Sequence, residues 1–388
     1  MAMETAPSDF GIYVHWPFCQ SKCPYCDFNS HVAEKIDQRD WAAAFESEID
    51  RLGDEIGPKL VSSIYFGGGT PSLMQPDTVD RILTALRRRF SWRNDIEVTL
   101  EANPSSVEVD RFVGYRQAGV NRISMGFQAM NDADLKALGR LHSAETALHA
   151  LQSARSVFCR VSFDLIYARQ NQTLIDWQEE LSAALALGPT HLSLYQLTVE
   201  DGTAFAQRFA AGSLRGLPDE NLSFDLFMAT QQLCDDYGLP AYEVSNHAIP
   251  GAESKHNLIY WRGGDYLGVG PGAHGRITVD GRRFATVAPK APGAWLHQVQ
   301  LGNTGEDPRE ELTPLDWAQE FILMGLRTTE GIDLGRLTLL TGKTLAEESI
   351  FSLQTLGLIC REGPRLQTTL QGRLVLNGVI RDLTASLS

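Results

Sequence analysis

The chain has 388 residues, of which 43% are hydrophobic and 21% are charged. This composition is typical of a globular protein large enough to form two domains. Its formal net charge is −14, which argues against non-specific nucleic-acid binding and against electrostatic attachment to anionic lipid. No apolar run in the sequence is long enough to span a bilayer, and residues 1–8 carry Glu4 but no basic residue, so we expect neither a membrane anchor nor a secretory signal. Six cysteines in a chain of this length do not suggest a disulfide framework, and we predict a cytoplasmic location.

The first chemical motif is a cysteine loop near the N-terminus, Cys19-Gln-Ser-Lys-Cys23-Pro-Tyr-Cys26. A loop this tight can bring three thiolates to one corner of an iron–sulfur cube. A closed structural metal site needs four protein ligands, whereas three leave one metal position open for a small molecule. The alternative is a zinc site completed by His15 or His31.

From about residue 10 to 250, short apolar runs alternate with amphipathic helical stretches. The sequence predicts strands over 11–16, 62–66, 97–102, 122–127, 160–167 and 191–197, and helices over 38–52, 77–90, 109–117, 144–156 and 174–187. This alternation predicts parallel βαβ units. Polar residues cluster at the C-terminal ends of nearly all the strands, which favours an incomplete (β/α)6 barrel over an open doubly wound sheet.

Glycine-rich or polar residues follow several of these strands. The run Gly67-Gly-Gly-Thr70 lets backbone groups approach a ligand closely, unless it is a plain tight turn. Glu101 follows the third strand and Asp164 lies within the fifth, where a carboxylate is costly unless it is paired. Gln128 ends the fourth strand, and Arg140 follows twelve residues later. A helix cap or salt bridge for Glu101, and a solvated helix-end cation for Arg140, are the structural alternatives.

Aromatic residues gather after the sixth strand. The stretch 219–237 predicts a helix and 241–247 a strand, and they are followed by Lys255-His-Asn-Leu-Ile-Tyr-Trp261 and by the glycine-rich segment 268–275. Rings for stacking and an imidazole for iron suit a flat aromatic ligand. The alternative is a packed aromatic cluster with a hydrogen-bonded histidine.

The C-terminal part of the sequence changes character twice. Residues 276–312 are rich in Gly and Pro and predict a connector. Helices are then expected over 313–326, 333–340, 345–356 and 370–386, with a hairpin formed by 358–360 and 365–368. Basic residues are too sparse here for a DNA-binding domain. We therefore predict three regions: 9–250 for the barrel, 251–312 for the aromatic motif and connector, and 313–388 for a C-terminal domain.

The cysteine spacing resembles the CxxxCxxC signature of the radical S-adenosylmethionine (SAM) superfamily. More narrowly, the stretch 13–30, YVHWPFC…KCPYCDFNS, resembles the branch that holds the oxygen-independent coproporphyrinogen oxidases and the HemW haem chaperones. The resemblance covers nearly the whole chain and implies an α/β fold, a partial (β/α)6 barrel followed by a small winged-helix-like α+β domain. It implies a 4Fe–4S cluster on Cys19, Cys23 and Cys26, with SAM chelated by the fourth iron. It also implies contacts to the cofactor SAM from Tyr13, Tyr25, Gly68, Gly69, Thr70, Glu101, Gln128, Arg140 and Asp164.

The HNxxYW pattern resembles the haem-associated motif of the HemW chaperones. The resemblance implies haem contacts from His256, Asn257, Tyr260 and Trp261. His256 is the first candidate for the ligand of the haem iron, and His274 is the second.

The resemblance implies a haem chaperone that transfers haem to an acceptor such as a respiratory membrane protein, with no nucleic-acid partner. The alternative is a radical SAM oxidase acting on coproporphyrinogen III or another tetrapyrrole. Two departures from the oxidase pattern favour the chaperone and hence a non-enzymatic role. Phe28 stands where the oxidase carries a further cysteine, and only eight or nine residues precede the first strand. A homodimer is compatible with the sequence.

Overall fold

A curved sheet of eleven strands forms the centre of the protein, seen here in a computed structural model that describes residues 9–388. Residues 1–8, for which no secretory signal is expected, lie outside the described residues. The strands of this sheet are β1 (Phe10–Trp16), β4 (Leu60–Gly68), β5 (Ser91–Ala102), β6 (Arg122–Gln128), β7 (Arg160–Tyr167), β8 (His191–Gln196), β9 (Asn246–Ala248), β10 (Asp265–Val269), β11 (His274–Val279), β12 (Arg282–Val287) and β13 (Glu310–Glu311). A separate short pair joins β2 (Phe18–Cys19) to β3 (His31–Val32).

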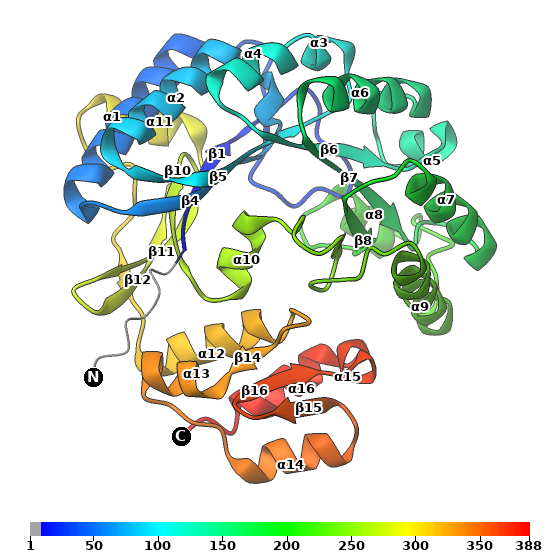
Figure 1. Ribbon diagram of the computed structural model, residues 1–388. Coiled ribbons are helices and arrows are strands. Elements are labelled where there is room, and N and C mark those ends of the chain that lie inside the picture. The colour runs from blue at the N-terminus through cyan, green and yellow to red at the C-terminus, as the bar shows by residue number, and fades with distance from the viewer. Residues whose placement is uncertain (1–8) are drawn as a thin grey trace.

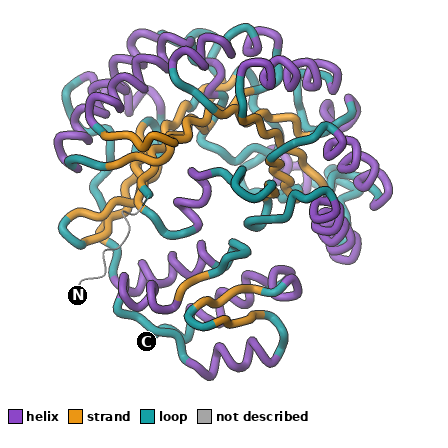
Figure 2. The backbone as a smooth tube through the Cα atoms, in the orientation of Figure 1, coloured by secondary structure: helices purple, strands orange, loops and turns teal. Residues whose placement is uncertain are grey.

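The six predicted strands lie side by side in chain order, β1-β4-β5-β6-β7-β8, and every neighbouring pair is parallel. A doubly wound sheet would reverse its strand order at a switch point, whereas this order is that of a barrel. The sheet curves and the helices cover its convex face (Figures 1 and 2). These helices are α1 (Gln38–Ile56), α2 (Pro76–Arg89), α3 (Ser106–Val109), α4 (Phe112–Ala118), α5 (Asp132–Ala137), α6 (Ala144–Val157), α7 (Leu174–Ala186) and α9 (Glu220–Asp236). The short helix α8 (Ala204–Ala210) lies against the cysteine loop, where the Phe205 amide donates to the Pro24 carbonyl over 2.9 Å. The predicted partial barrel is confirmed.

The alternation of side chains along β1 explains how the barrel is built. Ile12, Val14 and Trp16 are fully buried, and they point outward to the helices because alternate residues of a strand face opposite sides. Trp16 packs against Trp41 and Phe45 of α1, and burial of each such side chain contributes about 1.5–3 kcal/mol. The residues between them along β1 face the barrel interior. The same alternation on the next strands directs polar side chains inward.

The region 276–312 is not the connector that the sequence predicts. It continues the sheet through β11, β12 and β13, with α11 (Pro292–Gln300) packed beside α1. The prediction fails because Gly281, counted as a loop signal, is part of a tight hairpin: Asp280 and Gly281 both have positive φ, 50° and 76°. The strand predicted over 241–247 is also wrong, because only Asn246–Ala248 pairs with β8 as a strand.

One short helix, α10 (Lys255–Trp261), lies on the concave side of the sheet and carries the HNxxYW motif. Figure 1 shows it between the barrel strands and the C-terminal helices. The side chain of Ser254 caps this helix by accepting from the Asn257 amide. The motif is thereby held against the barrel interior.

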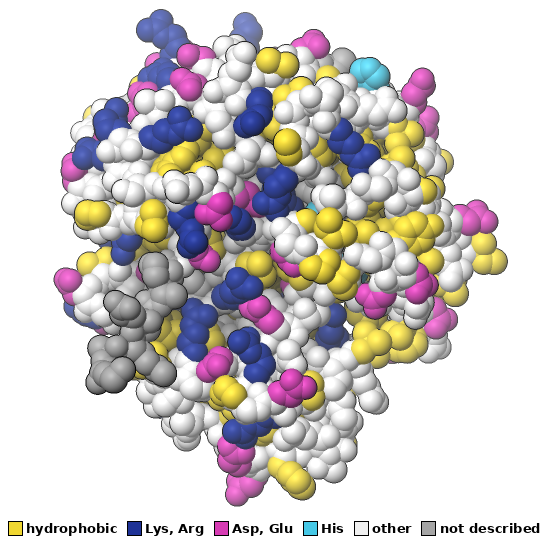
Figure 3. Space-filling view, viewed as in Figure 1, with side chains coloured by type: hydrophobic (Ala, Val, Ile, Leu, Met, Phe, Trp, Pro, Cys, Tyr) yellow, Lys and Arg dark blue, Asp and Glu magenta, His cyan; other side chains and the backbone are white. Residues whose placement is uncertain are grey.

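Residues after 313 pack around a second hydrophobic core that includes Ile322, Leu337 and Leu366. The predicted helix over 370–386 is broken at Val375 into two. Figure 3 shows basic and acidic side chains interspersed over one face of the molecule. Within residues 9–388, no helix is both long and apolar enough to cross a membrane. The elements of this region are α12 (Pro314–Gly325), β14 (Ile332–Asp333), α13 (Leu334–Thr341), α14 (Glu347–Thr355), β15 (Ile359–Glu362), β16 (Arg365–Thr368), α15 (Leu370–Leu374) and α16 (Leu376–Thr384).

Candidate functional site

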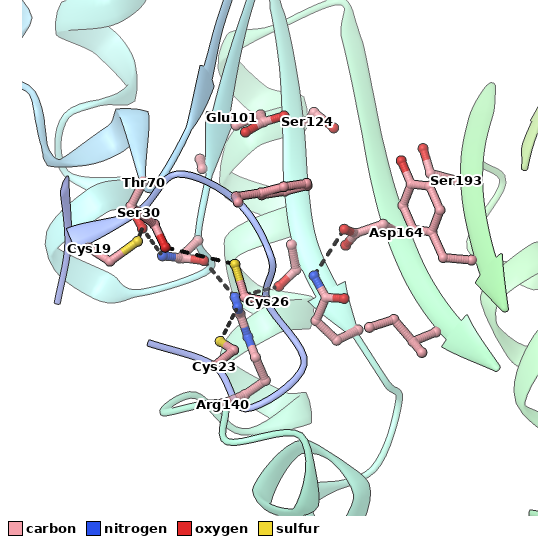
Figure 4. Close-up of a pocket in the computed structure, with 18 of the residues that line it drawn as sticks. Cys19, Cys23, Cys26, Ser30, Thr70, Glu101, Ser124, Arg140, Asp164 and Ser193 are labelled. Atoms are coloured by element: carbon pink, nitrogen blue, oxygen red, sulfur yellow. Dashed lines mark hydrogen bonds between the residues drawn. The ribbon is translucent and has the colours of Figure 1, made fainter. Parts of the chain in front are cut away.

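A cavity of about 800 Å³ occupies the barrel interior, and the cysteine loop lies at its mouth. The C-terminal ends of the parallel strands face this mouth, which is the usual place for functional groups in such barrels. Figure 4 shows Cys19, Cys23 and Cys26 gathered on one side of the cavity and Asp164 on the other.

Each cysteine sulfur has a polar neighbour. The Thr70 hydroxyl donates to Cys19 Sγ over 3.5 Å, an Nη1 of Arg140 donates to Cys23 Sγ over 3.5 Å, and Ser30 Oγ lies 3.9 Å from Cys26 Sγ. Burial raises the pKa of the Cys19 and Cys26 thiols, and the hydroxyl bonds oppose that rise. A thiolate must be deprotonated to bind a metal, and donors around the sulfur stabilise that charge. The loop therefore fits a metal–sulfur site.

The zinc alternative lacks a fourth ligand. The two ring nitrogens of His15 lie 2.9 Å from the Tyr13 hydroxyl and 2.9 Å from the Asn29 carbonyl oxygen, and His31 Nε2 is 3.2 Å from the Asn29 side-chain oxygen. Across residues 9–388, no three His, Cys, Asp or Glu side chains are close enough together to hold a single metal ion. The arrangement of the sulfurs does not support a mononuclear zinc site.

The glycine run at the end of β4 packs against the cysteine loop. The amides of Gly69 and Thr70 donate to the carbonyls of Trp16 and Phe18 over 2.7 and 2.8 Å. Gly68 has φ = 116°, and a Cβ there would lie 2.6 Å from the His15 ring. Only glycine satisfies this position, because it combines left-handed backbone with no room for a side chain.

Two half-buried acids lie across the cavity from the cysteines. The Tyr65 hydroxyl donates to Glu101 over 2.7 Å, and the Gln128 side-chain amide donates to Asp164 Oδ2 over 2.9 Å. Burial raises the pKa of Glu101 to about 7 and that of Asp164 to about 6. Gln128 has a positive φ of 73° beside an irregularity in the β6–β7 pairing, a strained conformation that clusters at functional sites. Asp164 Oδ1 is buried without a partner among residues 9–388.

Arg140 is a half-buried cation with protein partners and not the solvated helix-end residue of the structural alternative. Its Nη2 donates to the Asn103 side-chain oxygen over 2.5 Å and to the Gly126 carbonyl over 3.1 Å. The neighbouring Tyr25, Cys23 and Asp164 favour its charged form, and its pKa lies above the ordinary value. A charged guanidinium in this position can bind a carboxylate.

The structure brings most of the predicted site residues together. Those that line the cavity are Cys19, Cys23, Cys26, Tyr25, Gly68, Gly69, Thr70, Glu101, Gln128, Arg140, Asp164 and Asn257. Tyr13 stands behind Tyr65, with the ring centroids 6.3 Å apart. His256, Tyr260 and Trp261 of α10 are not among the lining residues, and the His256 ring bonds to the Tyr260 hydroxyl one turn along the helix.

His256 is fully engaged within the protein core. It is 1% exposed, its Nδ1 lies 2.7 Å from the Ser63 hydroxyl and its Nε2 lies 2.7 Å from the Tyr260 hydroxyl. The ring also stacks on Tyr65 at 5.0 Å. Burial lowers the pKa of His256 to about 3, so the ring is neutral. It must give up one hydrogen bond before a ring nitrogen can ligate iron.

Two residues that position other residues of the site, Asn29 and Asn103, were not identified from the sequence. The Asn29 side-chain amide donates to the carbonyls of Pro271 and Lys290, each over 3.0 Å, and so joins the cysteine loop to the glycine-rich segment after β10. Asn103 orients Arg140, and its only sequence signal was its place after Glu101 at the end of β5. No signal in the sequence points to Asn29, because its partners are more than 240 positions away.

Two family profiles match this chain. The profile of the radical SAM superfamily matches residues 13–184, and that of the HemN C-terminal domain matches residues 312–375. The heme chaperone HemW of Haemophilus influenzae is 36% identical over 381 residues, covering 95% of this chain and 96% of its own. This chain belongs to the HemW-type branch of the radical SAM superfamily. The resemblance inferred from the sequence is confirmed.

Other relatives of this HemW-type chain agree with that placement. Escherichia coli heme chaperone HemW is 35% identical, covering 95% of this chain and 96% of its own. The mitochondrial radical S-adenosyl methionine domain-containing protein 1 of Bos taurus is 37% identical, covering 97% of this chain and 87% of its own. The structure of the coproporphyrinogen III oxidase HemN from Escherichia coli superposes with a TM-score of 0.81 at 23% identity, covering 98% of this chain and 91% of that one. That likeness confirms the fold.

Proposed function

We propose that this protein binds a 4Fe–4S cluster, SAM and haem, and that it transfers haem to an acceptor protein. Membership of the radical SAM superfamily implies the cluster and SAM. The observation that carries the proposal is the cavity in which three cysteine sulfurs face Arg140 and Asp164. The relatives named as heme chaperones support the haem part.

Cys19, Cys23 and Cys26 would hold the cluster. Three thiolates leave one iron open, and the Thr70 hydroxyl and Arg140 guanidinium beside them stabilise negative charge on sulfur. When bound, such a cluster supplies the electron that cleaves a carbon–sulfur bond of SAM.

The remaining cavity residues fit the parts of SAM. Arg140 would bind its carboxylate, and the backbone around Gly68 and Gly69 would receive its amino group. The unpartnered Asp164 Oδ1 would accept from a ribose hydroxyl. Glu101, Gln128 and Tyr25 complete the lining. Tyr13 would act through its contact with Tyr65 and not by direct contact.

Apolar side chains at the cavity mouth support the docking of a flat apolar ligand. Phe28 is 60% exposed and Leu141 is 76% exposed, and both line the cavity. Exposed apolar residues around a concave site are typical of ligand surfaces. Phe28 is also the position at which the oxidase pattern has a cysteine.

His256 and His274 remain the two candidates for the haem ligand. Ligation by His256 would require α10 to release the bond to Tyr260 or to Ser63, whereas the exposed His274 ring on β11 needs no rearrangement of the core. Asn257 lines the cavity, and Tyr260 and Trp261 would reach haem only after such a release. We therefore expect slow haem capture if His256 is the ligand.

Anaerobic reconstitution tests the cluster. Replacement of Cys19, Cys23 or Cys26 by Ala should abolish the iron–sulfur absorbance, while Cys159→Ala, at an exposed cysteine outside the cavity, should leave it unchanged. An unchanged spectrum in the three loop variants, or zinc in place of iron and sulfide, would refute the cluster.

Haem titration and a turnover assay test the rest. Wild-type protein should bind haem with saturation. If His256 is the iron ligand, His256→Ala should weaken haem binding; if His274 is the ligand, His274→Ala should weaken it. The reconstituted protein should not convert coproporphyrinogen to protoporphyrinogen, and measurable turnover would favour the oxidase alternative. The haem acceptor, the homodimer and the cytoplasmic location stay predictions. On location, the relative from Bos taurus is named as mitochondrial.

A further inference from the structure

The cavity continues beyond Glu101 and Asp164 to a floor lined by polar side chains. Because every second residue of a strand faces inward, Thr99 on β5 and Ser162 on β7 lie one layer deeper than those acids. Thr99 pairs in register with Arg122 of β6. We call this layer the barrel floor; its lining residues are Thr99, Arg122, Ser162, His191, Ser193 and Asn246.

Two guanidinium groups share one carboxylate at the barrel floor. Arg122 is 3% exposed, and Glu97, which is fully buried, accepts from it over 3.1 Å. Glu97 also forms an ion pair of 2.6 Å with Arg160. One carboxylate is thus shared by two guanidinium groups. A buried cation without a carboxylate of its own favours an additional anion.

Much of the Arg122 guanidinium is free to bind a ligand. Within residues 9–388, its side chain makes one hydrogen bond, from Nη1 to Glu97, while the guanidinium lines the cavity. The planar fork of an arginine matches the two oxygens of a carboxylate. Burial raises the pKa of the acids one layer above, Glu101 to about 7 and Asp164 to about 6, so their negative charge is reduced but not abolished at neutral pH.

Two further buried polar atoms at the floor lack partners among residues 9–388: Thr99 Oγ1 and His191 Nδ1. Both residues are at most 4% exposed and both line the cavity. Native proteins rarely leave such atoms unpaired, because each costs about as much as a lost hydrogen bond. Both atoms thus retain hydrogen-bonding capacity at the floor of the cavity.

The hydrogen-bond chain around His191 indicates which nitrogen carries its proton. The Tyr242 hydroxyl accepts from the Ser254 amide over 3.4 Å and lies 2.9 Å from His191 Nε2. We assign the tautomer in which the Tyr242 hydroxyl donates to Nε2 and the ring proton lies on Nδ1, which has no other partner in the described part of the chain. His191 is neutral, since burial and the nearby Arg122 keep its pKa well below the ordinary value. Nδ1–H therefore donates into the cavity.

We propose that the barrel floor binds the carboxylate of a small organic acid, held by the Arg122 fork, the Thr99 hydroxyl and His191 Nδ1–H. A carboxylate has about four acceptor sites, which these donors fill. A phosphate dianion would bring two negative charges to a floor where Arg122 and Arg160 already share Glu97 and where Asn246 donates to the buried Glu243. The site goes beyond haem transfer and does not depend on it. It assigns an organic-acid ligand to the interior of the barrel, deeper than the residues proposed for SAM.

Propionate serves as the probe, because it is a small carboxylate that fits beside SAM. The reconstituted, SAM-loaded full-length protein is titrated with propionate, and saturation-transfer NMR reports its binding. We expect saturable binding in the millimolar range, as suits a ligand with few atoms, and no binding of the neutral propionamide. Equal binding of propionamide, or a stronger response to inorganic phosphate, would overturn the proposal.

Three variants locate the site. Arg122→Gln should abolish propionate binding, and Arg122→Lys, which keeps the charge but loses the fork, should weaken it about tenfold. Thr99→Val should weaken it about threefold and raise the melting temperature, because it removes an unpartnered buried hydroxyl. Thr341→Val, which changes a buried threonine of the C-terminal core, should leave binding unchanged. Wild-type propionate affinity in both Thr99→Val and Arg122→Lys would overturn the assignment.

Discussion

The Arg140 guanidinium donates to the sulfur of Cys23 over 3.5 Å, although the two residues are 117 positions apart in the chain. The same guanidinium is oriented by Asn103 and by the Gly126 carbonyl. The charge of Arg140 thus faces the cavity at the point where cluster and SAM are proposed to meet. In the proposed arrangement, Arg140 is the cation between the two cofactors.

Replacing Arg140 by Met should weaken SAM binding at least tenfold, because a charge-assisted bond to the cofactor carboxylate is lost. Iron content should fall less than SAM affinity, since the three cysteines are intact and only one donor to Cys23 is lost. Anaerobic calorimetry with SAM measures the change. Arg208→Met on the exposed surface of α8 is the control, and it should bind SAM normally. Wild-type affinity in Arg140→Met would contradict the proposed role.

Asn29 should determine how firmly the cysteine loop is held. In Asn29→Asp, a carboxylate replaces the amide that donates to two carbonyls, so repulsion replaces both hydrogen bonds. We expect a loss of about 1–3 kcal/mol in unfolding free energy and faster loss of iron to a chelator. Asn303→Asp, at an exposed position, should change neither measurement. Unchanged chelation kinetics in Asn29→Asp would show that the loop does not need this contact.

Gly68→Ala should be strongly destabilising. The new Cβ would lie 2.6 Å from the His15 ring at φ = 116°, and the combined strain and overpacking cost about 3 kcal/mol. Denaturant unfolding monitored by circular dichroism gives the value. Gly293→Ala is the matched control, since nothing lies within 4 Å of its added Cβ in α11. That control should be neutral or slightly stabilising, and a similarly mild result at Gly68 would disprove the steric argument.

His247 should make the fold sensitive to acid. Burial and the charge of Arg373 lower its pKa to about 4. The unfolded chain takes up a proton below its ordinary pKa of about 6.5, whereas the folded protein does so only near pH 4. Stability from this group is therefore present above pH 6.5 and is lost as pH falls toward 4, by about 1.4 kcal/mol per pH unit.

The variant His247→Gln isolates this effect. Unfolding free energies at pH 7.5 and pH 5.5 should differ by about 1.4 kcal/mol less in the variant than in wild type. His149→Gln, at an exposed position on α6, should keep the wild-type difference. An unaltered acid response in His247→Gln would show that the ring is not a source of the pH dependence.

The sequence by itself determined the barrel and the cysteine loop. Strand β7 was predicted with its observed bounds, and the six parallel strands followed from alternation of apolar and amphipathic runs. Such patterns can be read from the sequence because successive side chains of a strand point to opposite faces of the sheet, so apolar residues recur at regular positions within each strand. The spacing of Cys19, Cys23 and Cys26 is likewise local.

Only the tertiary structure decided which distant groups meet. It joined Asn29 to Pro271, brought Arg140 beside Cys23, and placed His256 between Ser63 and Tyr260. It also converted the predicted connector into strands that extend the sheet. Contacts between residues far apart in the chain depend on how strands and helices pack, and no local pattern of residue types records that packing.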